Sequence, residues 1–204
     1  MAGKLLSIEG IDGCGKSTHA RLLSRWLRSR GYETIVTDEP TDGPIGRIIK
    51  QALRGKLKLP VAAEALLFAA DRAQHVAEVI KPALDAGKVV ITERYTYSSL
   101  AYQSARGLPA PWIEAINRGA MKPDLTIIID VPVEVALARM RRSRRLDKFE
   151  SNPQLQRRVR ANYLRLARQR GLKVVDGSRA IEEVQAEIRR IVGATLGSGR
   201  AATC

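Results

Sequence analysis

Short apolar runs alternate along this chain with longer stretches in which apolar residues recur every three or four positions. The runs with the length and composition of buried strands are 5–8, 34–36, 89–92, 125–129 and 174–175. Helical periodicity follows Ser17, Pro44 and Pro111 and covers 62–84, 133–140, 153–170 and 181–192. Strands that alternate with helices in this way predict a three-layer α/β fold, in which a five-stranded parallel sheet carries helices on both faces.

The chain has the size of one domain. Its 204 residues, of which 45% are hydrophobic, suffice for one sizeable core. We assign residues 1–192 to this domain and expect residues 193–204, which are mostly small and polar, to form a flexible tail. No stretch of 18 apolar residues is present and no signal sequence follows Met1, which predicts a soluble cytoplasmic protein without a membrane partner.

A glycine-rich segment joins the first predicted strand to the first predicted helix. Residues 10–17 read Gly-Ile-Asp-Gly-Cys-Gly-Lys-Ser and match the pattern G-x-x-x-x-G-K-[ST] without a mismatch. The position between a strand and a helix favours a phosphate-binding loop over a chance glycine turn, because backbone N–H groups and a helix N-terminus attract phosphate. We predict that the phosphates of a nucleotide bind at Gly10, Ile11, Asp12, Gly13, Cys14, Gly15, Lys16, Ser17 and Thr18.

Charged residues near the carboxyl ends of the strands add to this prediction. Lys16 can reach the terminal phosphates of a nucleotide, and the Ser17 hydroxyl can bind Mg²⁺. Glu93 ends the third apolar run, where its carboxylate can hold the same ion, and Arg94 can bind an acceptor phosphate through two nitrogens. An ordinary Glu-Arg pair at a strand end is the alternative, but in open α/β sheets ligands bind beyond these strand ends.

Two features of the composition leave alternatives open. Cys14 is either a thiol activated by the helix N-terminus or a small residue tolerated in the loop, and with Cys204 it cannot form a disulfide framework. The net charge is +14, from 35 basic and 21 acidic residues, and twelve of the basic residues lie between positions 139 and 170. This concentration fits nonspecific nucleic-acid binding, a solvated helix face, or a lid that closes over phosphates.

Several further segments resemble the thymidylate kinase family over nearly the whole chain, from Lys4 to about Val192. They are the opening segment at 8–18, Glu39-Pro40, LLFAADRAQH at 66–75, ERY with SS and AYQ between 93 and 103, and LDKFE at 146–150. The resemblance implies the fold of P-loop kinases and transfer of the γ-phosphoryl group of ATP to dTMP, with Mg²⁺. It also implies a homodimer formed through helices on one side of the domain, which the apolar content of 62–84 permits.

The same resemblance implies a site for the acceptor. Phe68 would stack on thymine, Arg72 would donate to the edge of the base, and Arg94 would hold the dTMP phosphate. Tyr102 would crowd the 2′ position of the sugar, and Asp12 would face its 3′ side. The full set of implied substrate-binding residues is Asp12, Glu39, Phe68, Arg72, Arg94, Ser98, Ser99, Tyr102 and Gln103.

The basic stretch gains an interpretation from this resemblance. The phosphate loop has no arginine at positions 13 and 14, and in similar family members of the bacterial type a mobile lid supplies one. An Arg-rich lid at about 141–150 would bring an arginine to the charge of the transferring phosphoryl group. The predicted catalytic residues are therefore Lys16 and Arg94, with Arg144 or Arg145 from the lid.

The sequence departs from the family pattern at two positions. Three other functions are also considered, and the sequence favours each of them less. Glu93 stands where the family often has Asp, which can make metal binding water-mediated, and Lys148 replaces an Arg. Phe68, Arg72 and Tyr102 disfavour a kinase for UMP, CMP or a deoxynucleoside. No groove of aromatic and basic side chains is evident for a nucleic-acid-binding ATPase, so no specific nucleic acid partner is expected, and an inactive scaffold would not need the complete loop.

Overall fold

Five parallel strands form the centre of the fold in the computed structural model, which describes residues 3–141, 149 and 152–197. The sheet order is β2-β3-β1-β4-β5. The strands are β1 Lys4–Glu9, β2 Thr34–Asp38, β3 Val89–Glu93, β4 Leu125–Asp130 and β5 Lys173–Asp176. Each contains one of the predicted apolar runs and every neighbouring pair is parallel, so the predicted α/β class is confirmed.

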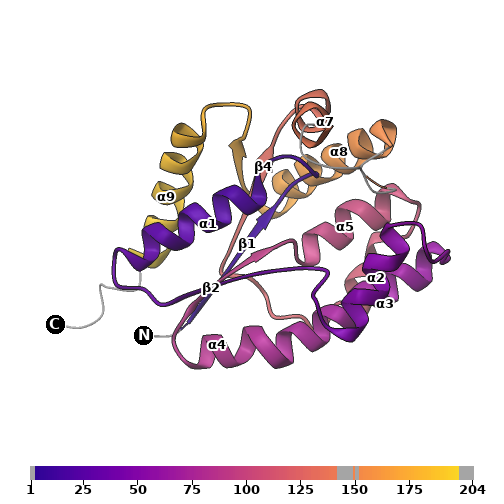
Figure 1. Cartoon of the computed structure of the whole chain (residues 1–204), viewed down its shortest axis with the longest axis horizontal. Coiled ribbons are helices and arrows are strands. Elements are labelled where there is room, and N and C mark those ends of the chain that lie inside the picture. Colours follow the sequence, from indigo (N-terminus) through magenta and orange to yellow (C-terminus); the bar gives the residue numbers. More distant parts are fainter. Residues whose placement is uncertain (1–2, 142–148, 150–151, 198–204) are drawn as a thin grey trace.

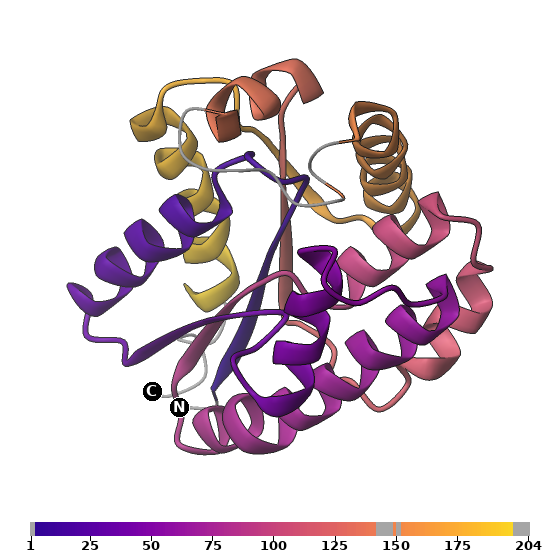
Figure 2. The ribbon, with the colours of Figure 1, turned by 45° about the vertical axis from the view of Figure 1, so that its right-hand side comes forward.

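Helices cover both faces of this sheet (Figure 1). On one face lie α1 Lys16–Arg28 and α9 Ile181–Gly197, and on the other lie α4 Lys81–Asp85, α5 Thr96–Ala105 and α8 Pro153–Arg170. Figure 2 shows α5 and α8 side by side. The helices α2 Pro44–Leu53, α3 Val61–His75 and α6 Ala110–Ile116 extend the second layer beyond α5, and α7 Val133–Arg141 packs next to α8.

The burial of the strands follows their order in the sheet. The central strands β1, β3 and β4 are buried along nearly their whole length, and Ile8, Ile91 and Ile127 are at most 1% exposed. The edge strands β2 and β5 keep partly exposed positions. Continuous runs of branched apolar residues suit strands that are covered on both faces. Among the helices of the described residues, none is long and apolar enough to span a membrane.

The strand register brings three loops together at the carboxyl ends of the strands, which form one edge of the sheet. Asp38 on β2 lies opposite Glu93 on β3, and Glu93 lies opposite Ile8 on β1. The chain segments that follow these three strands therefore start side by side. This edge is the place where ligands bind in open parallel sheets.

Three helical segments differ from the sequence-based prediction. The stretch predicted as one helix over 62–84 contains a π-helical turn, Val76–Ile80, between α3 and α4. The prediction missed α5, because seven of its ten residues are buried, serine and glutamine among them, and no polar face alternates with an apolar one. The predicted helix end at Val192 is wrong, since α9 continues to Gly197.

Ile188→Ala tests how much the packing of α9 contributes to stability. The side chain is fully buried, so its truncation should lower the free energy of unfolding by about 3 kcal/mol. Ile181→Ala, at the start of the same helix, removes the same atoms from a residue that is 49% exposed and should cost less than about 1 kcal/mol. Urea denaturation followed by circular dichroism measures both variants, and equal losses would contradict this packing.

Candidate active site

Two glycines let the phosphate loop run close to neighbouring backbone. Gly10 has a φ of 138°, and a Cβ there would lie 2.4 Å from the carbonyl oxygen of Ile129 on β4. Gly13 has a φ of 76°, and a Cβ there would lie 2.4 Å from the carbonyl oxygen of Ala136 on α7. A larger residue at either position would displace the loop. The loop is thereby held in one shape at the N-terminus of α1, where its N–H groups suit an anion.

Lys16 folds back over this loop. Its Nζ donates to the carbonyl oxygens of Gly10, at 3.1 Å, and Ile11, at 2.8 Å. Ser17 and Thr18 follow it in the first turn of α1 and are exposed. The ammonium charge and the exposed hydroxyls thus lie together at the helix N-terminus, where phosphate oxygens can replace the two carbonyls.

Cys14 is packed beneath the loop rather than presented to solvent. It has no exposed surface, and its Sγ lies 3.7 Å from Lys16 Nζ. Reactive cysteines are accessible to the reagent that they attack. The burial therefore favours a small packed residue over an activated thiol.

Glu93 reaches from the end of β3 to the first turn of α1. Its Oε2 accepts a hydrogen bond of 2.5 Å from Ser17 Oγ. Burial raises the pKa of Glu93 above its usual range, against the opposing effects of this hydrogen bond and of the Lys16 charge. The described part of the chain has no group of three His, Cys, Asp or Glu that could hold a metal alone. The two neighbouring oxygens of Ser17 and Glu93 fit a Mg²⁺ ion that takes its other ligands from phosphates and water.

Arg94 turns away from the sheet immediately after Glu93. Its φ of 65° is the only left-handed value at a non-glycine residue among those described. The guanidinium forms an ion pair with Asp12, donates to Tyr102 Oη at 3.3 Å and donates to Ser98 Oγ at 3.2 Å. Its carbon also lies 5.0 Å from the centre of the Tyr102 ring. The side chain is thus fixed by three residues before any ligand binds.

The charges in this cluster are interdependent. Burial alone would raise the pKa of Asp12, but the charges of Arg94 and Lys16 and a 2.8 Å hydrogen bond from Tyr102 lower it to about 2. Burial and the charge of Asp12 raise the pKa of Tyr102 well above its usual range. Asp12 is therefore ionised at neutral pH, and Tyr102 remains a neutral donor beside it.

Arg72, from α3, forms the second charged cluster. It is only 2% exposed, and Nη2 donates to Glu39 Oε2 at 2.6 Å and to the Tyr95 carbonyl at 3.0 Å. Nη1 donates to Ser99 Oγ at 3.0 Å and contacts Asn117. Its Nε is buried and has no hydrogen-bond partner among the described residues. Arg72 is therefore a fixed cation, held through both of its terminal nitrogens.

Both histidines have structural contacts. His75 lies within hydrogen-bond distance of Glu39 through Nδ1, at 3.0 Å, and of Thr37 through Nε2, at 2.8 Å. His19 lies 2.9 Å from the side-chain nitrogen of Gln185, and burial lowers its pKa. These contacts join secondary-structure elements, so neither imidazole is oriented for proton transfer in the cleft.

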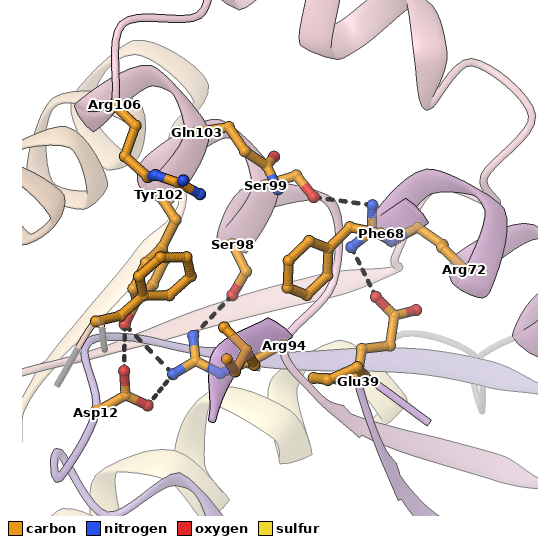
Figure 3. A pocket seen from close by; sticks show the side chains of 13 residues that line it. Asp12, Glu39, Phe68, Arg72, Arg94, Ser98, Ser99, Tyr102, Gln103 and Arg106 are labelled. Carbon is orange, nitrogen blue, oxygen red and sulfur yellow. Dashed lines mark hydrogen bonds and ion pairs between the residues drawn. The ribbon is translucent and has the colours of Figure 1, made fainter. Parts of the chain in front are cut away.

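One pocket brings the two charged clusters together, and Figure 3 shows Phe68 between them. All nine residues that the family resemblance implies for substrate binding line this pocket. They are Asp12, Glu39, Phe68, Arg72, Arg94, Ser98, Ser99, Tyr102 and Gln103. Gln103 is 4% exposed, and its Oε1 has no partner among the described residues. The pocket therefore offers an aromatic surface and two arginines to a ligand.

Arg106 and Phe149 also line the pocket, and the prediction from the sequence did not include them as site residues. The guanidinium of Arg106 lies 4.8 Å from the centre of the Phe149 ring and donates to Glu64 on α3 at 2.5 Å. Phe149 lies 5.9 Å from Tyr102 between ring centres. The LDKFE segment could have indicated Phe149, whereas nothing in the periodicity distinguishes Arg106 from a surface charge.

The lid predicted at about 141–150 lies almost wholly outside the described residues, and Arg144 and Arg145 are among those not described. On α8, five arginines of the basic stretch are exposed, namely Arg157, Arg158, Arg165, Arg168 and Arg170. Arg160 instead pairs with Asp130 at the end of β4, at 2.7 and 2.8 Å. A solvated helix face therefore describes the α8 part of the basic stretch.

Comparison with known proteins gives one consistent result. A family profile described as thymidylate kinase matches residues 8–188. The chain is 46% identical over 199 residues to a "Probable thymidylate kinase" of Thermococcus kodakarensis, which covers 93% of this chain and 97% of that protein. It is 46% identical over 200 residues to a "Thymidylate kinase" of Symbiobacterium thermophilum, which covers 94% of this chain and 93% of that protein. These matches span the loop and the pocket described above.

The ionisation of Asp12 should make the free energy of unfolding depend on pH in the acidic range. Its folded-state pKa of about 2 lies below the ordinary value of 3.8, so its ionised form stabilises the fold above about pH 4, and this contribution is lost as the pH falls through 2. Between about pH 5 and pH 2, the free energy of unfolding should fall less in Asp12→Asn than in the wild type. Asp85→Asn, whose side chain is 62% exposed, should follow the wild type. Parallel curves for all three proteins in urea denaturation would refute the assignment.

Proposed function

The chain belongs to the thymidylate kinase family and is a nucleoside monophosphate kinase, and we propose that it phosphorylates dTMP with ATP, giving dTDP and ADP. The observation that carries the proposal is the joining of two half-sites at one sheet edge. A complete phosphate loop follows β1, and a pocket with an aromatic wall and two fixed arginines opens beside it. A phosphoryl donor and a nucleotide acceptor can therefore meet at the end of β3.

The phosphate loop is the donor half of the proposed site. Gly10 to Thr18 would bind the phosphates of ATP, with Lys16 exchanging its contacts to Gly10 and Ile11 for the β- and γ-phosphate oxygens. Ser17 and Glu93 would hold Mg²⁺, directly or through water. When bound, the ion would neutralise charge on the phosphates. The loop itself would orient the phosphates, since its glycines lie close to the backbone of β4 and α7.

Arg94 is the proposed ligand of the acceptor phosphate. The phosphate of dTMP already carries an ionised oxygen, so the protein needs to orient it rather than remove a proton, which agrees with the structural roles of both histidines. Asp12 would face the 3′ side of the sugar, and Tyr102 would crowd the 2′ position and favour deoxyribose. A lid arginine, Arg144 or Arg145, would close over the transferring group and exclude water.

The remaining pocket residues suit a pyrimidine base. Phe68 would stack on thymine, and Arg72, which lines the same pocket, would donate to its O4 edge. Ser98, Ser99 and Gln103 line the same pocket and would add polar contacts. Glu39 would hold Arg72 in place through their 2.6 Å contact.

Assembly and location complete the proposal. The family resemblance implies a homodimer formed through helices on one side of the domain, and the stretch 62–84, in which Leu66 is 50% exposed, is the part of the chain that would take part. The expected cytoplasmic location is part of the same proposal, and so is the single domain, which extends beyond residue 192 to the end of α9 at Gly197.

A substrate panel tests the proposed reaction. ADP formation with MgATP is measured by a coupled assay with dTMP, dUMP, UMP, dCMP and thymidine as acceptors. The expected order of kcat/KM has dTMP first, with dUMP about 10- to 200-fold lower because it lacks one methyl group. UMP should be poorer still, and thymidine should give no ADP above background because it has no phosphate. A preference for UMP or dCMP, or ADP formation stimulated by polynucleotide alone, would reject the proposal.

A further inference from the structure

A buried carboxylate lies between the two half-sites and has no role in the reaction described so far. Glu9 is the last residue of β1, immediately before Gly10, and none of its surface is exposed. A buried carboxylate requires several hydrogen bonds, because it has lost its hydration. Within the described part of the chain, no Lys, Arg or His side chain forms an ion pair with Glu9, so neutral donors stabilise it.

Four donors converge on the two oxygens of Glu9. Oε1 accepts from the Tyr95 backbone N–H at 2.9 Å and from Ser7 Oγ at 3.2 Å. Oε2 accepts from Ser98 Oγ at 2.6 Å and from Tyr163 Oη at 3.0 Å. Three of these donors come from outside β1, from the β3 turn, α5 and α8. The carboxylate therefore fixes the positions of three elements around the acceptor pocket.

The first connection from Glu9 to Arg94 runs through a hydroxyl. Ser98 has one hydroxyl proton, and in donating it to Glu9 the oxygen turns a lone pair toward Arg94 Nη1, which lies 3.2 Å away. Tyr163 Oη lies 2.7 Å from the same Ser98 oxygen. Without the carboxylate, the Ser98 proton could turn toward Tyr163 or toward the guanidinium, so no single orientation of the hydroxyl would keep a lone pair on Arg94.

The second connection runs through the backbone. Arg94 has a φ of 65°, a conformation that non-glycine residues adopt only where the surroundings hold it. Its N–H donates to the Ile8 carbonyl at 3.0 Å, and its carbonyl accepts from Thr92 Oγ1 at 3.0 Å. The next N–H, that of Tyr95, donates to Glu9. The carboxylate thus anchors the peptide that follows the left-handed residue.

We propose that Glu9 is a positioning residue for acceptor binding, which holds both the backbone turn and the Ser98 hydroxyl that aim Arg94 at the acceptor phosphate. The inference rests on the proposed function, in which Arg94 binds that phosphate. Because Glu9 also adjoins the phosphate loop, it fixes the position of Arg94 relative to the loop that would hold the donor phosphates.

Glu9→Gln is the main test, since it keeps the size of the side chain and replaces one of the two acceptor oxygens by an NH₂ group, which donates. The KM for dTMP should rise about 10-fold or more, whereas the KM for ATP should stay within about twofold. Ser7→Ala is the matched control, because it removes a donor to the same carboxylate that has no contact with Arg94, and it should leave both values within about twofold. Equal rises in both KM values for Glu9→Gln, or no rise for dTMP, would overturn the proposal.

A double-mutant cycle separates positioning from general damage. If Glu9 acts through Arg94, then Glu9→Gln should add less than about twofold to the KM for dTMP of Arg94→Ala. Tyr163→Phe removes one donor to Glu9 and keeps the ring packing, and it should raise the KM for dTMP about threefold. If Glu9→Gln does not fold, Tyr163→Phe takes its place in the cycle. Additive effects would overturn the positioning role. A normal KM in Arg94→Ala would reject the proposed role of Arg94 as well, whereas a large Arg94 effect with a silent Glu9→Gln would reject the positioning role alone.

Discussion

The site depends on a single backbone turn at the end of β3, where Arg94 is held in a left-handed conformation. The three residues of this turn face three different parts of the site. Glu93 reaches Ser17 in the proposed donor half, Arg94 pairs with Asp12 in the proposed acceptor half, and the Tyr95 carbonyl accepts from Arg72 beside the proposed base pocket. A chain that continued in an extended conformation would separate these contacts. The strain of the turn is therefore tied to the function it serves.

The two arginines of the acceptor pocket are fixed before substrate binds. Arg94 is paired with Asp12, and Arg72 is paired with Glu39 at 2.6 Å with almost no exposed surface. Holding each guanidinium among several acceptors removes much of the conformational entropy that binding would otherwise cost. The carboxylates also balance the positive charge of the two guanidinium groups. The acceptor site is thus preorganised for an anionic, planar ligand.

Local sequence patterns predicted those parts of the site that consist of one contiguous segment of the chain. The phosphate loop is one contiguous segment between a strand and a helix, so the spacing of Gly10, Gly15 and Lys16 indicated its chemistry directly. Apolar runs located all five strands. Phe68 and Arg72 look like an ordinary helix residue and a surface charge in the sequence, and only the family resemblance assigned them to a site; both line the pocket.

Residues whose role depends on distant partners could not be predicted. Glu9 is separated by 86 positions from Tyr95 and by 154 from Tyr163, and Arg106 contacts a ring that stands far along the chain. Helix α5 carries Ser98, Ser99 and Gln103 on buried positions, where the demands of the pocket override the apolar pattern that marks a helix. These features become visible only when the sheet brings β1, β3 and α8 together.

Calorimetric titration of dTMP and of thymidine into the wild type and Arg94→Ala tests the role of this turn most directly. The two ligands differ only in the 5′-phosphate, so their affinity ratio isolates the contact made by Arg94. The wild type should bind dTMP about 100-fold more tightly than thymidine, and Arg94→Ala should reduce this ratio below about 10 while leaving thymidine affinity nearly unchanged. A ratio that Arg94→Ala leaves intact would contradict the assignment of the acceptor phosphate to Arg94.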